Sequence, residues 1–310
     1  MTIAIITHSD CLKHEMGIGH PERPQRIRAI EDQLITSGIG DFMHYYDAPL
    51  ATPEQLELAH SRKHIDYIFG KSPPDDSMMA HIDPDTFMNE FTLQAALRSA
   101  GSAISAVDKV LGDKTEKRVF CNVRPAGHHA ERDAAMGFCF FNNAAIAARH
   151  AVRDYGLERV AIVDFDVHHG NGTEDIVGDD PQILFCSTYQ HPLYPERALP
   201  SKPGFLINAP LPEGAGGAEF RETITEHWLP ELNAFKPQLV IISAGFDAHL
   251  EDEMAGLRLV EADYAWVTRE LCKIADKYSE GRIISLLEGG YDTSALARSV
   301  VAHLKVLMNI

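Results

Sequence analysis

The chain has 310 residues, 45% of them apolar and 24% charged, so it is long enough to bury a large core. Its formal net charge of −17 disfavours nucleic acid as a partner, because phosphate binding relies on clustered Lys and Arg. No stretch approaches the ~18 apolar residues of a membrane span. The cysteines are dispersed without a CxxC pair, which favours reduced thiols in a cytoplasmic protein.

Apolar runs and helical patterns alternate along the sequence. Strands are predicted at 2–7, 118–123, 159–165, 182–187, 238–243 and 282–287, and the first is interpreted as a strand rather than a signal peptide. Helices are predicted near 24–37, 53–70, 89–111, 140–155, 218–234, 262–279 and 293–308. The Pro- and Gly-rich pieces at 192–204 and 209–217 are interpreted as loops. We therefore predict one α/β domain over 1–310, with a central, mostly parallel sheet flanked by helices.

Polar side chains gather at the end of the strand predicted at 159–165. Asp164, Asp166 and His168 alternate along the chain, so they share one side if the strand continues through them. Asp247 follows a second buried strand in the same way. Open α/β sheets bind ligands at this end of their strands. Asp166, His168 and Asp247 supply two oxygens and one nitrogen, which leaves the open fourth position of a catalytic zinc site.

Two further strand ends carry polar groups. The adjacent imidazoles of His128 and His129 follow the strand at 118–123, where a solvated pair of loop histidines is the alternative. Tyr291 follows a glycine pair after the last predicted strand, and a tyrosine in that position is more often a packing residue. Because four strand ends each deliver polar groups, packing alone does not account for them.

Five motifs together resemble the zinc-dependent histone deacetylase family, namely RPAGHHA, GFCFFNN, VDFDVHHGNGT, SAGFDA and LEGGY. HHGNGT and GFCFFNN resemble its class II branch, which includes many bacterial amidohydrolases. The resemblance implies the three-layer arginase/deacetylase fold and hydrolysis of the amide of an acylated amine, with acetyl-lysine in proteins or peptides as the expected substrate. An acetylpolyamine amidohydrolase and a catalytically silent acyl-amine binding protein are the alternatives.

The resemblance also implies roles for single residues. The metal ligands are Asp166, His168 and Asp247, holding Zn²⁺ or, with the same donor atoms, Fe²⁺. The catalytic residues are His128 paired with Asp164, His129 paired with Asn171, and Tyr291. Since a carboxylate partner favours the imidazolium, His129 is expected to be the general base and His128 to contribute electrostatics. A structural K⁺ ion falls at Asp164, Asp166, His168 and Ser187. Because strand alternation would treat Asp164, Asp166 and His168 alike, these separate roles predict that the chain leaves regular β geometry by about Asp166.

Substrate contacts follow from the same resemblance. Phe138 and Tyr194 match the aromatic walls of the family's tunnel, which accepts a linear alkyl chain, and Gly137 is assigned to the same wall. Tyr194 replaces the more usual phenylalanine. Asp85 lies where relatives contact the substrate backbone or a substrate nitrogen.

The charge around the expected entrance keeps the polyamine alternative open. Met254 stands where polyamine-selecting relatives carry a glutamate, which favours acyl-lysine. Acidic residues nevertheless surround it at 251–253, and Glu15 lies in the first loop. A homo-oligomer is one alternative for the oligomeric state.

Overall fold

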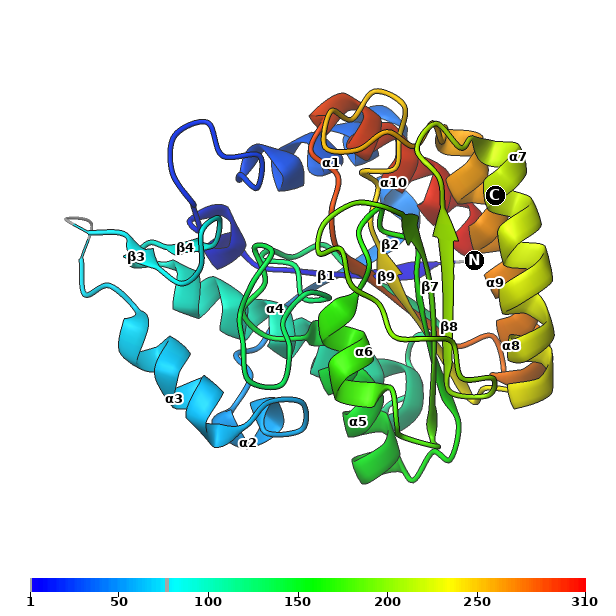
Figure 1. Ribbon diagram of the computed structural model, residues 1–310, viewed down its shortest axis with the longest axis horizontal. Helices are drawn as coiled ribbons and strands as arrows, with labels where there is room; N and C mark the ends of the chain where they lie inside the picture. The colour runs from blue at the N-terminus through cyan, green and yellow to red at the C-terminus, as the bar shows by residue number, and fades with distance from the viewer. Residues whose placement is uncertain (1, 76–77) are drawn as a thin grey trace.

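An eight-stranded parallel sheet forms the centre of the computed structural model, which describes residues 2–75 and 78–310 (Figure 1). The strand order is β2-β1-β5-β10-β9-β6-β7-β8, and every neighbouring pair is parallel. The strands are β1 (Ile3–Thr7), β2 (Met43–Asp47), β5 (Arg118–Cys121), β6 (Val160–Asp164), β7 (Ile183–Gln190), β8 (Leu206–Leu211), β9 (Leu239–Ala244) and β10 (Ile283–Leu287). A separate antiparallel pair joins β3 (Ala80–His81) to β4 (Phe87–Met88). The predicted α/β class and parallel sheet are confirmed.

Helices cover both faces of the sheet and complete a three-layer arrangement (Figure 1). One face carries α2 (Pro53–Leu56), α3 (Arg62–Lys71), α4 (Thr92–Val107), α5 (Asn143–Tyr155) and α6 (Asn171–Val177). The other carries α1 (Gln25–Thr36), α7 (Gly217–Thr223), α8 (Leu229–Phe235), α9 (Glu261–Tyr278) and α10 (Thr293–Leu307). Because side chains alternate along a strand, Ala4 and Ile6 of β1 pack into the first layer, whereas Ile3 and Ile5 pack into the second.

Local sequence signals set several helix ends. Thr52 and Gln55 form a reciprocal capping box at the start of α2, with Gln55 N–H donating to Thr52 Oγ1 over 3.3 Å. Asn142 caps α5 by accepting from Ala145 N–H at 2.9 Å, and Asp292 caps α10 in the same way. Each cap fixes the residue at which the preceding loop enters its helix.

The structure corrects two expectations from the sequence and confirms a third. The helix predicted over 53–70 is two helices, because Ser61 caps a new one by accepting from His64 N–H. The piece at 209–217 is not wholly a loop, since β8 runs to Leu211. Strand β6 ends at Asp164, which confirms that the chain leaves regular β geometry by about Asp166. The chain turns where the Asp164 carboxylate accepts from Asp166 N–H at 3.1 Å.

In the described part of the chain, no helix combines the length and the apolar character that crossing a bilayer requires. All five cysteines are buried and unpaired. The cytoplasmic location and the absence of nucleic-acid partners stay predictions.

Candidate metal centre and active-site cavity

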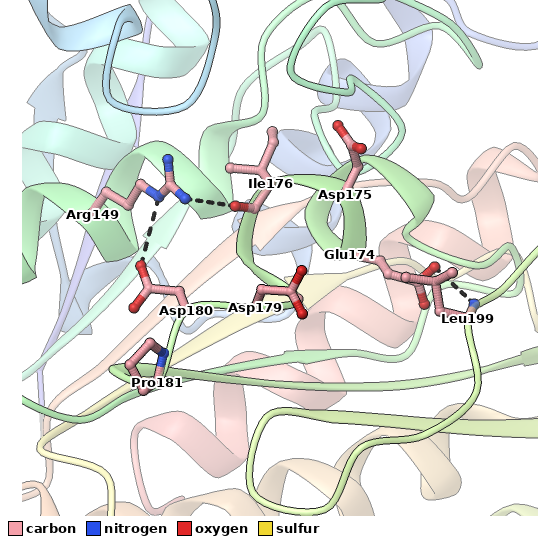
Figure 2. Close-up of a pocket in the computed structure, with 9 residues that line it drawn as sticks. Arg149, Glu174, Asp175, Ile176, Asp179, Asp180, Pro181 and Leu199 are labelled. Carbon is pink, nitrogen blue, oxygen red and sulfur yellow. Dashed lines mark hydrogen bonds and ion pairs between the residues drawn. The ribbon is translucent and has the colours of Figure 1, made fainter.

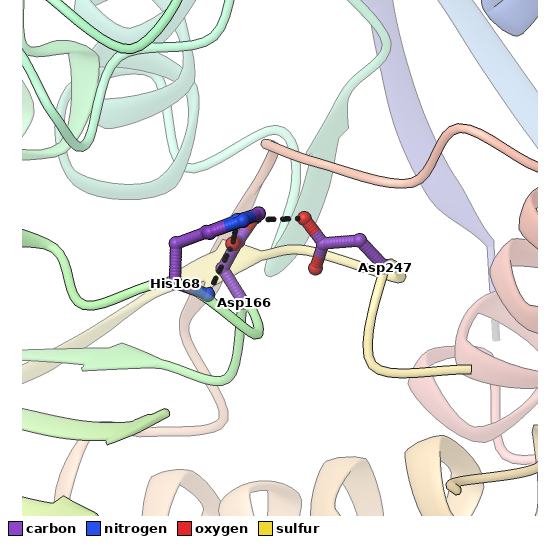
Figure 3. A group of neighbouring side chains, drawn as sticks. All are labelled: Asp166, His168 and Asp247. Atoms are coloured by element: carbon purple, nitrogen blue, oxygen red, sulfur yellow. Dashed lines mark hydrogen bonds and ion pairs between the residues drawn. The ribbon is translucent and has the colours of Figure 1, made fainter. Parts of the chain in front are cut away.

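Asp166, His168 and Asp247 meet at the carboxyl edge of the sheet, where the turns after β6 and β9 lie side by side (Figure 3). Their ligand atoms lie within 4.8 Å of one another, and all three residues are buried. His168 Nδ1 is 3.1 Å from Asp166 Oδ1 and 3.2 Å from Asp247 Oδ2. The three predicted ligands therefore meet although Asp166 and His168 lie beyond the end of β6, where side chains no longer alternate as in a strand.

The donor set fits a cation. Asp247 Oδ2 is buried and has no hydrogen-bond partner, because its contact with His168 Nδ1 lacks hydrogen-bond geometry. Burial and the negative charge of Asp166 raise the pKa of Asp247 to about 7. Burial disfavours a charged His168, yet the carboxylates of Asp166 and Asp247 raise the pKa of His168 to about 10. Two buried carboxylates and an imidazole nitrogen directed between them suit a divalent ion such as Zn²⁺ or Fe²⁺.

His128 and His129 lie beside this triad with different partners. His128 Nδ1 is 3.0 Å from Asp164 Oδ2, and its Nε2 is 3.8 Å from Asp166 Oδ1. Burial alone would lower the pKa of His128, but Asp166 and Asp164 raise it well above its ordinary value. His129 Nδ1 is 2.7 Å from Asn171 Oδ1, and burial together with the charge of His128 lowers the pKa of His129 well below its usual value.

A cavity of about 190 Å³ reaches His168 of the triad. Its walls include His129, His168 and Tyr291 from the predicted chemical centre. The predicted substrate contacts also line it, namely Asp85, Gly137, Phe138, Tyr194 and Met254. Leu193 completes the lining and was not expected; its place beside Tyr194 in the apolar part of a loop was the available signal.

Backbone geometry holds the aromatic wall in place. Gly137 and Phe138 both have positive φ values, +56° and +68°. This conformation is unfavourable for a phenylalanine, and Phe138 N–H is fixed by Thr86 Oγ1 at 3.0 Å. A Cβ on Gly137 would lie 2.5 Å from His129 Cδ2, so only glycine allows the loop to approach that imidazole. The rings of Phe138 and Tyr291 then meet edge to face, with their centroids 6.0 Å apart.

Glu288 is a site residue that the sequence motifs did not assign, although a charged residue directly after a buried strand was a signal. Its Oε2 accepts from the N–H groups of Gly127 and His128 at 2.7 and 3.1 Å. Its Oε1 accepts from Ser243 Oγ at 3.0 Å. Burial raises the pKa of Glu288 to about 7. The side chain thus ties the loop of the tandem histidines to β9 and β10.

Ser187 lies apart from the cavity. It pairs in register with Asp164 across β6 and β7, and its buried hydroxyl has no hydrogen-bond partner. His169, the second histidine of the HHGNGT motif, contacts Asn208 at 3.0 Å and does not join the metal ligands.

Comparisons with known proteins cover nearly the whole chain. A family model described as the histone deacetylase domain matches residues 20–307. A probable deacetylase of Archaeoglobus fulgidus is 36% identical over 299 residues, covering 94% of this chain and 82% of that protein. Polyamine deacetylase HDAC10 of Mus musculus is 34% identical over 333 residues, covering 99% of this chain and 48% of that protein. The crystal structure of the HDA15 HD domain matches with a TM-score of 0.92 and 33% identity, covering 100% of this chain and 90% of that domain.

Proposed function

Because this chain belongs to the histone deacetylase family, and is therefore a hydrolase of acylated amines, we propose that its substrate is an acetyl-lysine side chain in a protein or peptide. The cavity carries this proposal. Phe138 and Tyr194 form walls suited to a linear alkyl chain, and His168 of the metal triad lines the same cavity. We further propose that residues 1–310 act as one catalytic domain.

Zn²⁺ is the metal we propose, held by Asp166, His168 and Asp247; Fe²⁺ suits the same ligands. When bound, the ion polarises the acyl carbonyl and lowers the pKa of water. A structural K⁺ ion, with Asp164, Asp166, His168 and Ser187 as its neighbours, is supported by the unpartnered Ser187 hydroxyl.

The chain's own residues supply the proton chemistry in this proposal. His129 Nδ1 faces an amide oxygen, which can only accept, so Nδ1 carries hydrogen and Nε2 is free to take a proton from water. The same Nε2 returns this proton to the departing amine. His128, held by Asp164, places positive charge beside the reacting carbonyl. Tyr291 donates its hydroxyl hydrogen to the developing oxyanion.

An acetylpolyamine is the competing substrate, and one relative is named a polyamine deacetylase. An open hollow of about 390 Å³ beside Tyr291 is lined by Glu251, Asp252 and Glu253. Two of these carboxylates already have partners, however. Glu251 accepts from Arg298 at 2.7 Å, and Asp252 accepts from the N–H groups of Tyr291 and its neighbour. This arrangement leaves less free negative charge for a polycation, which supports acetyl-lysine.

Steady-state kinetics test the proposal. Purified protein is assayed with an acetyl-lysine peptide, N-acetylputrescine and N-acetylspermidine, before and after chelation and Zn²⁺ restoration. We expect kcat/KM for the peptide to be at least about tenfold higher than for either polyamine. Chelation should abolish turnover and Zn²⁺ should restore it. Preference for an acetylpolyamine would overturn the substrate assignment, and turnover insensitive to chelation would overturn the metal assignment.

A further inference from the structure

We propose that Glu131 is a positioning residue for His129, acting through the side-chain amide of Asn171. The inference rests on the proposed function, because it concerns which nitrogen of the general base carries hydrogen. Glu131 follows the tandem histidines by two residues and has no role among the groups described above.

Three side chains form a continuous chain of hydrogen bonds. His129 Nδ1 is 2.7 Å from Asn171 Oδ1, and Asn171 Nδ2 donates to Glu131 Oε1 over 2.8 Å. His129 and Asn171 are each only 4% exposed, whereas the Glu131 side chain is 20% exposed. This series of hydrogen bonds therefore leads from the active-site cavity towards the surface.

The chemistry of these groups fixes the direction of each bond. An ionised carboxylate only accepts hydrogen bonds, so Glu131 requires the amide nitrogen of Asn171 to face it. The amide oxygen must then face His129, which places hydrogen on Nδ1 and the lone pair on Nε2. If the amide rotated by half a turn, its nitrogen would donate to Nδ1, and Nε2 would carry the hydrogen. His129 could not accept a proton from water in that form.

Glu131 is itself held from several sides. Its N–H donates to Ala134 O at 2.8 Å, and its carbonyl accepts from His60 Nδ1 at 2.9 Å. His60 Nε2 accepts from Asn142 N–H at 2.8 Å, so the hydrogen of this imidazole is on Nδ1. The Arg197 guanidinium pairs with Glu131 Oε1. Both the backbone and the side chain of Glu131 are thus fixed for the contact with Asn171.

Neighbouring carboxylates do not duplicate this contact. A surface hollow of about 190 Å³ exposes Glu131 and Asn171, together with Glu174 and Asp175. Glu174 and Asp175 also line an adjoining hollow of about 500 Å³ (Figure 2). In that hollow Glu174 accepts from Leu199 N–H at 2.9 Å, whereas Asp175 points away from Leu199. Asp175 accepts from Arg132 N–H at 2.9 Å. Asp175 is therefore a matched control, an acidic side chain of the same hollow whose carboxylate accepts from Arg132 N–H, whereas Glu131 accepts from the side-chain amide of Asn171.

The first test compares Glu131→Met, which keeps the length but removes the acceptor, with Glu131→Gln, which keeps a carbonyl acceptor. For Glu131→Met we expect a fall in kcat of about tenfold with KM unchanged, the magnitude typical of second-layer contacts. Glu131→Gln should recover most of the activity, and Asp175→Asn should match the wild type. In an Asn171→Ala background, Glu131→Met should have no further effect. If Glu131→Met does not fold, Glu131→Leu, which also lacks an oxygen acceptor, makes the same comparison.

The second test reads the tautomer without using turnover. In ¹⁵N-histidine-labelled protein, with and without Zn²⁺, long-range ¹H–¹⁵N spectra should show His129 with hydrogen on Nδ1. The Glu131→Met variant should show a shifted population with hydrogen on Nε2. Unchanged tautomer and unchanged kcat in Glu131→Met, or equal losses in Glu131→Met and Glu131→Gln, would overturn this inference alone. Near-native turnover in His129→Ala would instead overturn the proposed role of His129 as base.

Discussion

At the scale of single residues, the tandem histidines show how one partner determines what an imidazole does. His128 and His129 are adjacent and almost equally buried, and Asp166 acts on both. The carboxylate of Asp164 favours the charged form of His128, whereas the neutral amide of Asn171 contributes no charge to His129. Two identical side chains thereby acquire opposite pKa shifts.

Tyr291 allows the proposed oxyanion contact to be tested. Tyr291→Phe removes one hydroxyl and keeps the ring that packs on Phe138. We expect kcat to fall by about 10²–10³-fold, because a single oxyanion donor is lost. Bound Zn²⁺ and the melting temperature should be unchanged. A Tyr291→Phe enzyme with wild-type kcat would show that the hydroxyl does not take part.

The proposed metal ligands were easier to predict from sequence than the residues that position the site. Carboxylates and imidazoles clustered at the ends of buried strands are seldom packing residues, so the motifs of Asp166, His168 and Asp247 point to a metal directly. Glu131 and Glu288 act through neighbours that are distant in the sequence, Asn171 for one and Ser243 for the other. An isolated glutamate has no spacing pattern that identifies such a partner.

At the scale of elements, the ends of β9 and β10 approach the triad so closely that side chains are excluded. A Cβ on Gly245 would lie 2.1 Å from Asp166 Oδ2. A Cβ on Gly289 would lie 2.0 Å from Asp247 Oδ2 and 2.6 Å from Asp166 Oδ2. These two glycines therefore belong to the metal centre, although neither supplies a ligand.

Gly289→Ala tests this packing. The added methyl group must displace the carboxylates of Asp247 and Asp166, so we expect Zn²⁺ affinity to fall by at least about tenfold. A competition titration against a metal indicator measures the change. Gly70→Ala is the control, since nothing lies within 4 Å of its added Cβ. Equal Zn²⁺ affinity in the two variants would contradict the argument.

The elements that the sequence did not predict are strands without an apolar run and helices too short to show a repeated helical spacing of apolar residues. In β2, four of five residues are at least partly exposed, because it is an edge strand. The other edge strand, β8, contains Pro210, which is tolerated at an edge but made the segment resemble a loop. Helix α6 has only seven residues and begins at the Gly-Asn-Gly turn. The central strands, buried on both faces, were all predicted.

At the scale of the whole molecule, the buried titratable groups make stability depend on pH. His303 of α10 is enclosed by the hydroxyls of Thr268 and Ser285, 2.6 and 2.9 Å from its nitrogens, without a carboxylate partner. Burial lowers its pKa to about 3. Between about pH 3 and 6.5 the unfolded chain therefore binds a proton that the folded chain does not. The contribution is fully present above about pH 6.5 and is lost as the pH falls towards 3.

His303→Gln isolates this contribution, because groups such as Glu288, whose pKa is raised, act with the opposite sign in both proteins. We expect the free energy of unfolding of the wild type, relative to the variant, to fall by about 2 kcal/mol between pH 7 and pH 5. Urea denaturation at several pH values measures it. A difference that stays constant over this range would show that His303 is not held neutral.

The position of β10 in the sheet has a consequence for how the chain matures. β10 comes last among the eight strands in the sequence, yet it lies between β5 and β9 in the middle of the sheet. On a ribosome, the strands made earlier emerge as two groups that cannot be joined until β10 is inserted between them. Glu288, Gly289 and Tyr291 arrive with that same segment. The active-site cavity therefore stays incomplete in a nascent chain until β10 and the segment after it have been made.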